Sequence, residues 1–188
     1  MSEKIKYFFT SDTHFSSERT LQLSKRPFKT TQEHDDTLIK NWNFIVSKND
    51  IVYHLGDFGD YYCNNYLNGK TILLLGNYEY ETINNDFKGS FEEFKEYLIH
   101  VCNFYDVWEH DGYFNNGKDL FGIRMTHKPS NCEKGRFNLF GHVHKLSMVK
   151  RFGLNVGVDC HNFYPIDEEV VKFYRNAIIN HYDEEVFM

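Results

Sequence analysis

Long apolar segments are missing from this sequence of 188 residues. No stretch approaches the ~18 continuous apolar residues that a membrane-spanning helix needs. Only residues 1–4 precede the first apolar run, too few for the basic region, apolar core and cleavage site of a secretory signal. We therefore expect a cytoplasmic protein that makes no use of a membrane.

Cysteine and positive charge are also in short supply. The cysteines are far apart and form no Cys-x-x-Cys pair, so we expect reduced thiols rather than a disulfide framework. The formal net charge of -6 argues against an extensive surface for nucleic acid or anionic membrane. An anionic substrate would have to be attracted locally, for example by bound metal ions. The cysteines are Cys63, Cys102, Cys132 and Cys160.

Linkers and repeats are absent from the sequence as well. It has only 3 prolines, and no low-complexity tract or internal repeat interrupts it. A hydrophobic content of 41% in a chain of this length is enough for one sizeable core. We therefore expect a single domain over residues 1–188.

The sequence does contain short apolar runs, rich in β-branched and aromatic residues, that predict buried strands. They cover residues 5–10, 51–55, 71–75, 120–125 and 154–158, and another run ends at Gly141. Capping boxes at residues 30–33 and 90–93 predict helices, and a last helix begins near Pro165. The 115–117 turn, flanked by aromatic residues, predicts a hairpin. Because strands and helices do not alternate strictly, the pattern favours a mixed α/β sandwich.

Candidate metal ligands follow these strands. On an extended backbone, side chains at i and i+2 point to the same face, so Asp12 with His14, and His142 with His144, can each reach one small volume. Loops at strand ends are also where α/β folds assemble sites. The candidates are Asp12, His14, Asp57, Asn77, His127, His142 and His144.

These N and O donors suffice for two divalent ions if one carboxylate bridges the ions and water fills the remaining positions. Asp57 is the natural bridge. Paired ions roughly 3.5–4 Å apart suit displacement at phosphorus. Carboxylate, amide and imidazole donors without thiolate favour Mn, with Fe, Zn, Ni or Co as alternatives, over Ca or a structural zinc.

Five blocks of the sequence resemble the calcineurin-like metallophosphoesterase family. They are Asp12-x-His14, Gly56-Asp57, Gly76-Asn77, His127 and Gly141-His142-x-His144, in that order, within residues 7–144. The resemblance implies an α/β/β/α sandwich of two mixed sheets flanked by helices, with a dinuclear site at the carboxyl ends of the strands. It assigns Asp12, His14, Asp57 and His144 to one ion, and Asp57, Asn77, His127 and His142 to the other. Shorter matches, such as Arg26-Pro27-Phe28, are similar to a small bacterial and phage group of predicted phosphoesterases.

The leading hypothesis is a phosphoesterase that hydrolyses phosphodiesters more readily than monoesters by attack of a metal-bridging hydroxide. Asp57, Asn77 and Tyr78 would form its catalytic centre, and nucleotide-derived esters are among its candidate substrates. The alternative is a catalytically weak metal-binding scaffold or regulator that uses the same fold to dock a partner.

Tyr78 departs from the family pattern, which usually has Gly-Asn-His where this chain has Gly76-Asn77-Tyr78. The missing His generally protonates the leaving group or steadies the phosphate. A phenol, with a reference pKa of about 10, can donate a hydrogen bond but is a poor proton donor to an alkoxide at neutral pH. We expect the metal site to survive and acid catalysis to weaken. The Gly-His that the bacterial group usually carries is also replaced, by Ser16-Ser17.

Two further residues are candidate substrate contacts. Arg26 could bind phosphate through two N–H groups, or could instead anchor its loop. His161 could reach the site from the loop that follows residues 154–158. His54 lies inside a predicted strand and is expected in the core or in support of a ligand. The histidines expected to be solvated or to cap helices are His34, His100, His110 and His181.

Overall fold

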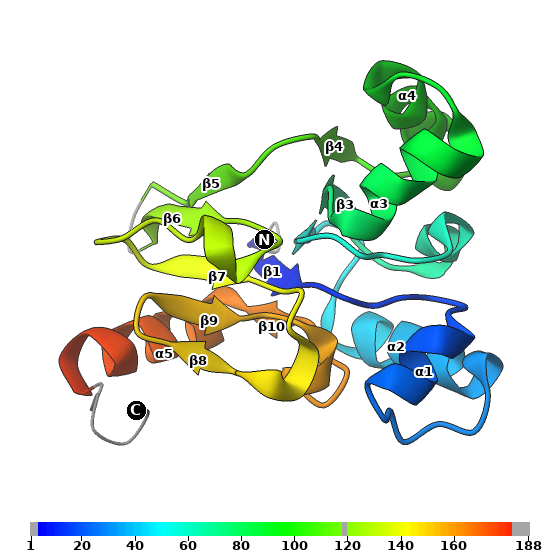
Figure 1. Cartoon of the computed structure of the whole chain (residues 1–188). Helices are drawn as coiled ribbons and strands as arrows, with labels where there is room; N and C mark the ends of the chain where they lie inside the picture. Colours follow the sequence, from blue (N-terminus) through cyan, green and yellow to red (C-terminus); the bar gives the residue numbers. More distant parts are fainter. Residues whose placement is uncertain (1–3, 118–119, 182–188) are drawn as a thin grey trace.

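Two mixed sheets of five strands pack against one another in the computed structural model, which describes residues 4–117 and 120–181 (Figure 1). Their facing sides share one hydrophobic cluster, in which the rings of Phe9 and Phe114 lie 5.0 Å apart. Helices flank the sheets, so the predicted class, a sandwich of two mixed sheets with flanking helices, is confirmed.

The first sheet has the order β10-β1-β2-β3-β4. Its central strands run parallel to each other and β10 is antiparallel to β1. The strands are β1 (Tyr7–Thr10), β2 (Ile51–His54), β3 (Lys70–Leu74), β4 (Asp106–Trp108) and β10 (Ile166–Asp167).

The second sheet has the order β5-β6-β7-β9-β8. The predicted hairpin is the antiparallel pair β5 and β6, while β6, β7 and β9 are parallel neighbours and β8 is antiparallel to β9. The strands are β5 (Gly112–Asn115), β6 (Phe121–Met125), β7 (Asn138–Phe140), β8 (Val149–Lys150) and β9 (Gly153–Asn155).

Successive side chains along a strand point to opposite faces of the sheet, and those on the outer face hold the helices. Phe8 and Val52 face outward and pack against Trp42 of α2, whereas Phe9 faces the second sheet. Further along the outer face, α4 packs onto β3 and β4. The helix α5 contacts β1, β9 and β10 and joins the cluster that contains Phe9. Both predicted starts, at Thr30 and Ser90, begin a helix. The capping box is complete at Ser90, whereas at Thr30 only the side-chain bond from the Glu33 N–H forms. The helices are α1 (Glu18–Leu23), α2 (Thr31–Ile45), α3 (Asn77–Thr82), α4 (Phe91–Cys102) and α5 (Glu168–His181).

Short elements were the hardest to predict. The helix α3, with a π-helical turn at Ile83–Phe87 after it, and the two-residue strands β8 and β10 were not predicted. Six residues are too few to show a helical period, and the two-residue strands are defined by pairing with β9 and β1 rather than by their own composition. Short 3-10 turns occupy Tyr61–Tyr66, Pro129–Asn131, His144–Leu146 and Val158–Cys160.

The carboxyl ends of the parallel strands meet at one edge of the sandwich. A parallel bridge between Ser11, directly after β1, and Gly157, beyond β9, joins the two sheets there. All four cysteines are free, as expected. Over the described part of the chain, no helix has the length and apolarity to cross a membrane.

Candidate metal centre

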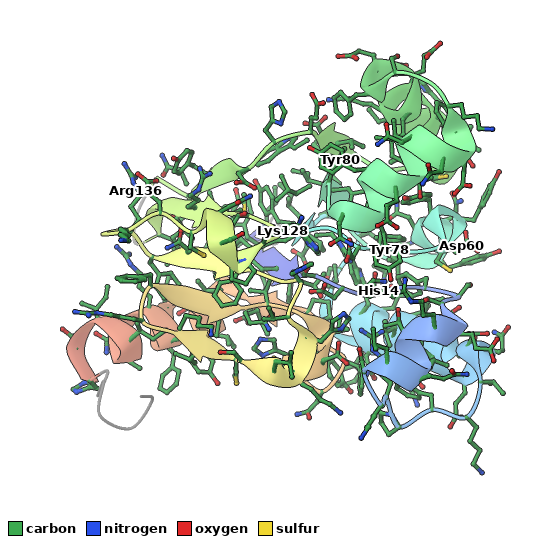
Figure 2. All side chains as sticks on the ribbon, viewed as in Figure 1. His14, Asp60, Tyr78, Tyr80, Lys128 and Arg136 are labelled. Atoms are coloured by element: carbon green, nitrogen blue, oxygen red, sulfur yellow. The ribbon has the colours of Figure 1, made fainter. Side chains whose placement is uncertain are left out.

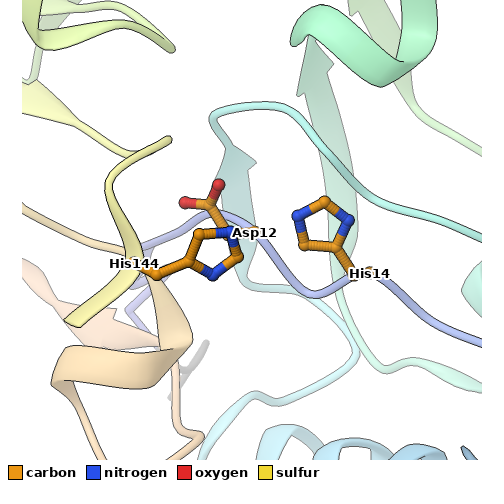
Figure 3. Close-up of side chains that lie close together, drawn as sticks. All are labelled: Asp12, His14 and His144. Carbon is orange, nitrogen blue, oxygen red and sulfur yellow. The ribbon is translucent and has the colours of Figure 1, made fainter. Parts of the chain in front are cut away.

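The seven predicted ligands converge where the two sheets meet. Two groups have ligand atoms that all lie within 4.8 Å of one another: Asp12 with His14 and His144, and Asp57 with His127 and His142. We call these the first and the second group. Figure 3 shows the first, with the imidazoles of His14 and His144 beside the Asp12 carboxylate.

The first group combines segments that are far apart in the sequence. Asp12 and His14 follow β1, and the ring of His144 lies nearly parallel to that of His14 with centroids 5.2 Å apart. His14 is 2% exposed, and its Nε2 atom has no hydrogen-bond partner. A buried nitrogen without a partner is costly in a stable fold. A metal ion at this position would supply the missing partner.

The second group has Asn77 at its centre. The Oδ1 atom of Asn77 lies 3.0 Å from Nε2 of His127 and 2.9 Å from Nδ1 of His142. The Nδ1 of His127 donates to the Leu55 carbonyl at 2.8 Å, which leaves Nε2 as the coordinating atom. The Nε2 of His127 also lies 3.4 Å from Oδ2 of Asp57. All four side chains thus point at one volume.

Several ligands have an unusual backbone conformation. Five of the seven are in the left-handed region, with φ of 57° at Asp12, 49° at His14, 59° at Asp57, 71° at His142 and 47° at His144. Non-glycine residues pay about 1 kcal/mol or more to adopt it, and such strain gathers at functional sites. Gly141 is needed for close packing, since a Cβ there would lie 2.5 Å from Oδ2 of Asp12.

The electrostatics of the site favour a cation. Burial lowers the pKa of His14 to about 3, so its imidazole is neutral and able to coordinate. Burial also lowers the pKa of His127, but its hydrogen bond to Asp57 and the charge of Asp12 outweigh that effect and raise the pKa to about 9. The carboxylates thus draw positive charge to the volume that the ligands surround.

Asp159 supports the first group, and sequence reasoning missed it. Its carboxylate accepts from Nδ1 of His144 at 2.7 Å and from the Arg26 guanidinium at 2.7 and 3.0 Å. A carboxylate behind a metal-binding imidazole fixes the orientation of the ring and leaves the other nitrogen for the ion. These contacts also lower the pKa of Asp159, against the effect of burial. The residue could have been found, because it too follows an apolar run.

Arg26 is placed as a structural anchor. All five of its N–H donors are used within the protein: two on Asp159, one on each carbonyl of Asp12 and Thr13, and one on Nε2 of His34. The side chain is fully buried. This geometry matches the loop-anchoring alternative and leaves no donor for a phosphate.

His34 corrects another expectation. It was expected to be solvated or to cap a helix, but it is 0% exposed. Since its Nε2 accepts from Arg26, its Nδ1 carries the proton and donates to Asp35 at 2.7 Å. Asp35 in turn accepts from the backbone and hydroxyl of Ser16. A buried polar chain therefore runs from α2 to His144.

Glu79 supports the second group and was also missed. It is 0% exposed and accepts from the backbone N–H groups of Asp57, Phe58 and Gly76 at 2.7–2.8 Å. Burial, with the nearby charge of Asp57, raises its pKa to about 7. Its position three residues after Gly76, the capping-box spacing, was a usable signal.

Tyr78 stands beside the first group, although it belongs to α3. Its ring meets that of His14 edge to face with centroids 4.9 Å apart, and its N–H donates to Oδ1 of Asp57 at 3.0 Å.

His161 is turned toward its own loop, because its Nε2 donates to the Asn155 carbonyl at 2.7 Å. His54 is buried and bonded to Thr13, as expected of a core residue. The other three histidines, His100, His110 and His181, are exposed.

A cavity of about 540 Å³ adjoins the second group, with Asn77 and His127 in its wall. The Tyr80 ring forms another part of the wall, held by its hydroxyl, which donates to the Glu109 carbonyl at 2.6 Å. Lys128, in the loop that follows β6, also lines the cavity (Figure 2). The volume falls within the ~300–1,000 Å³ typical of small-molecule sites.

The chain is similar to known proteins in sequence and in fold. An uncharacterized protein of Methanocaldococcus jannaschii is 29% identical over 176 residues, which are 88% of this chain and 89% of that protein. The gene 66 protein of Mycobacterium phage L5 is 32% identical over 81 residues, 38% of this chain and 39% of its own. The crystal structure of a protein of unknown function from Aquifex aeolicus shares the fold, with a TM-score of 0.68 and 19% identity over 91% of this chain and 100% of its own.

The family profile of the calcineurin-like phosphoesterases matches residues 5–176, and so covers all seven ligands. Two groups of carboxylate and imidazole donors at the shared edge of two mixed sheets fit the two divalent ions that such enzymes use. The chain therefore belongs to the calcineurin-like phosphoesterases, a family of metal-dependent enzymes that hydrolyse phosphoester bonds.

Proposed function

We propose that this protein is a dinuclear phosphodiesterase in which Asp57 bridges two divalent ions, with Mn as the preferred metal. The position of Asp57 is the observation that carries the proposal. Its Oδ2 atom lies 3.6 Å from Nε2 of His14 in the first group and 3.4 Å from Nε2 of His127 in the second. One carboxylate oxygen therefore faces both groups of ligands.

The bound ions would activate the attacking water and offset charge on the phosphoryl oxygens. The protein residues hold this chemistry in place. Glu79 fixes the backbone of Asp57 through two N–H groups, and the N–H of Tyr78 takes up the other oxygen of that carboxylate. Asn77 presents its amide oxygen to the second group. No covalent bond to the protein is required.

The cavity beside the second group supports a preference for diesters. A phosphodiester carries a second substituent on phosphorus, and that substituent needs space next to the reacting centre. The cavity shares Asn77 and His127 with the metal centre, so a group attached to bound phosphorus can extend into it. A monoester would leave this space to water.

The presence of Tyr78 favours esters with activated leaving groups as the best substrates. Its hydroxyl accepts a hydrogen bond from Arg19 at 3.0 Å, in an exposed position. We propose that the phenol does not protonate the leaving group, so that stabilisation of its departure would have to come from the bound ions. Nitrophenyl diesters should then react readily and alkyl monoesters hardly at all.

The test is a screen of purified protein, with added Mn or other divalent ions, on paired monoester and diester substrates. We expect about two ions per chain by elemental analysis, and a drop in melting temperature on chelation, because a ligand bound only by the native state stabilises it by about 4 kcal/mol at a thousand times its Kd. Two bound ions without hydrolysis of any ester would favour the metal-binding scaffold. A melting temperature indifferent to both chelator and Mn would exclude the site itself.

A further inference from the structure

One exposed arginine stands close to the metal centre. Arg19 lies on the short helix α1, which begins after Ser17, and its Nη1 atom donates to the Tyr78 hydroxyl at 3.0 Å. The Tyr78 ring in turn contacts the ring of His14, a ligand of the first group. Figure 2 shows Tyr78 and His14 next to each other, between the ribbons of α1 and α3 in this view. Tyr78 thus connects Arg19 to the metal centre.

The contact contributes little to the stability of the fold. Arg19 is exposed and Tyr78 is half-buried, and a hydrogen bond at the surface adds little free energy. What it does is restrain a long flexible side chain. A guanidinium has five N–H donors in a rigid planar fork, and the Tyr78 hydroxyl occupies one of them.

Arg26 and Arg19 differ in whether their N–H donors are free to bind a phosphate. The sequence pattern offered Arg26 as the phosphate-binding arginine, but its five donors are all used inside the protein. Arg19 carries the same fork, is exposed, and bonds to Tyr78, whose ring contacts that of His14 in the first group. A phosphoryl group held by two ions presents non-bridging oxygens, which guanidinium groups bind through paired hydrogen bonds.

We propose that Arg19 binds a non-bridging oxygen of the phosphodiester and that the Tyr78 hydroxyl positions its guanidinium for this contact. The pair replaces the phosphate-steadying part of the role of the family histidine and leaves out its proton donation. This inference rests on the proposed function, because it places the contact on the substrate of that same centre. It makes Arg19 a catalytic residue and Tyr78 a positioning residue.

The experiment compares Arg19→Ala, Arg19→Lys and Tyr78→Phe in the metal-loaded full chain. Arg136→Ala is the matched control, since Arg136 is an exposed arginine at the far side of the second sheet (Figure 2). We expect Arg19→Ala to lower kcat/KM for a nitrophenyl diester by roughly 10- to 100-fold, less than the 10²- to 10³-fold loss of a buried oxyanion donor, because the site is exposed. Arg19→Lys should recover only part of this, since an ammonium cannot form the planar pair of bonds.

Two further readouts separate this role from a structural one. Inorganic phosphate should bind Arg19→Ala about 10-fold more weakly than wild type by calorimetry, while the metal content of both stays equal. Tyr78→Phe should cause a smaller loss, and should cause no further loss when combined with Arg19→Ala, because the hydroxyl acts only through the guanidinium.

The outcomes distinguish the inference from the function on which it rests. An active wild type with Arg19→Ala equal to Arg136→Ala overturns the role of Arg19 and leaves the phosphodiesterase intact. A wild type that binds phosphate without turnover overturns the proposed function, and the phosphate affinity of Arg19→Ala then decides the contact. A wild type that neither binds phosphate nor hydrolyses esters overturns both.

Discussion

The first and second groups of ligands are held in place by different means. Behind the first group lies a chain of buried side chains, in which Asp159 and Arg26 fix the ring of His144. Behind the second group lies a single carboxylate, Glu79, which fixes the backbone on which Asp57 stands. The first group is backed by buried side chains, whereas the second adjoins the cavity.

This difference in support suits the two groups to different tasks, one to hold the substrate in a fixed position and the other to accommodate a substituent. A ligand set backed by fully bonded buried groups cannot shift without breaking several contacts, so the first group provides a fixed reference for the substrate. The second group has free volume beside it and can receive a substituent of the ester. Asp57, whose Oδ2 atom faces ligands of both groups, is where the two tasks meet.

The strongest test of this division between the two groups is to replace Asp57, the residue that faces both. Asp57→Asn should lower kcat by about 10³-fold or more and reduce the occupancy of both ions, because it removes the negative charge of the carboxylate whose Oδ2 atom faces both groups. Elemental analysis and initial rates measure the two effects. Asp60→Asn makes the same chemical change at an exposed position three residues away and should have neither effect. Full activity in Asp57→Asn would show that no bridge exists there.

Tyr78→His tests the chemistry next to the first group. General acid catalysis typically contributes 10²- to 10⁴-fold, so the new imidazole should raise the rate on substrates with poor leaving groups by up to about that range and change activated esters much less. The measurement is the dependence of rate on leaving-group pKa, with Tyr78→Phe as the control that keeps the ring. Equal and shallow slopes in wild type and Tyr78→His would contradict the view that Tyr78 lacks this role.

Replacing Asp159 and Glu79, the two supporting carboxylates, tests whether the two groups of ligands are held independently. Asp159→Asn leaves the buried Arg26 without its counter-charge, which should cost about 3–5 kcal/mol of unfolding free energy, and should weaken ion binding in the first group by about 10- to 100-fold. Glu79→Gln should cost about 1–3 kcal/mol and weaken both ions, because it disturbs Asp57. Metal titration followed by elemental analysis should find one tightly held ion in the first variant. Identical losses in both variants would contradict the division.

The smallest expected effect concerns the cavity. Tyr80→Ala should raise KM for a diester with a bulky second substituent by about 5-fold, equivalent to about 1 kcal/mol, and leave a methyl diester unchanged. Metal content should not change, since the Tyr80 hydroxyl bonds to the Glu109 carbonyl rather than to a ligand of either group. Tyr66→Ala removes a tyrosine that is 68% exposed and lies outside the cavity wall, and serves as the control. An equal rise for both esters would argue against the cavity as the substituent site.

The sequence by itself determined the class of fold and the set of candidate ligands. Apolar runs that end at Asp12, Asp57 and Asn77 are local signals, because strand formation and the loop that follows depend on neighbouring residues. The capping boxes before α2 and α4 are local in the same way. Such signals do not depend on knowing which strands pair.

Only the tertiary structure decided how the supporting residues pair with one another and with the ligands. Asp159 and Arg26 are 133 residues apart, and Arg19 and Tyr78 are 59 apart, so no spacing in the sequence relates them. Arg26 looked available for phosphate because the groups that accept its hydrogen bonds lie on other segments of the chain. Burial and pairing are properties of the packed chain, and a charged side chain changes its role when its partners come from another segment.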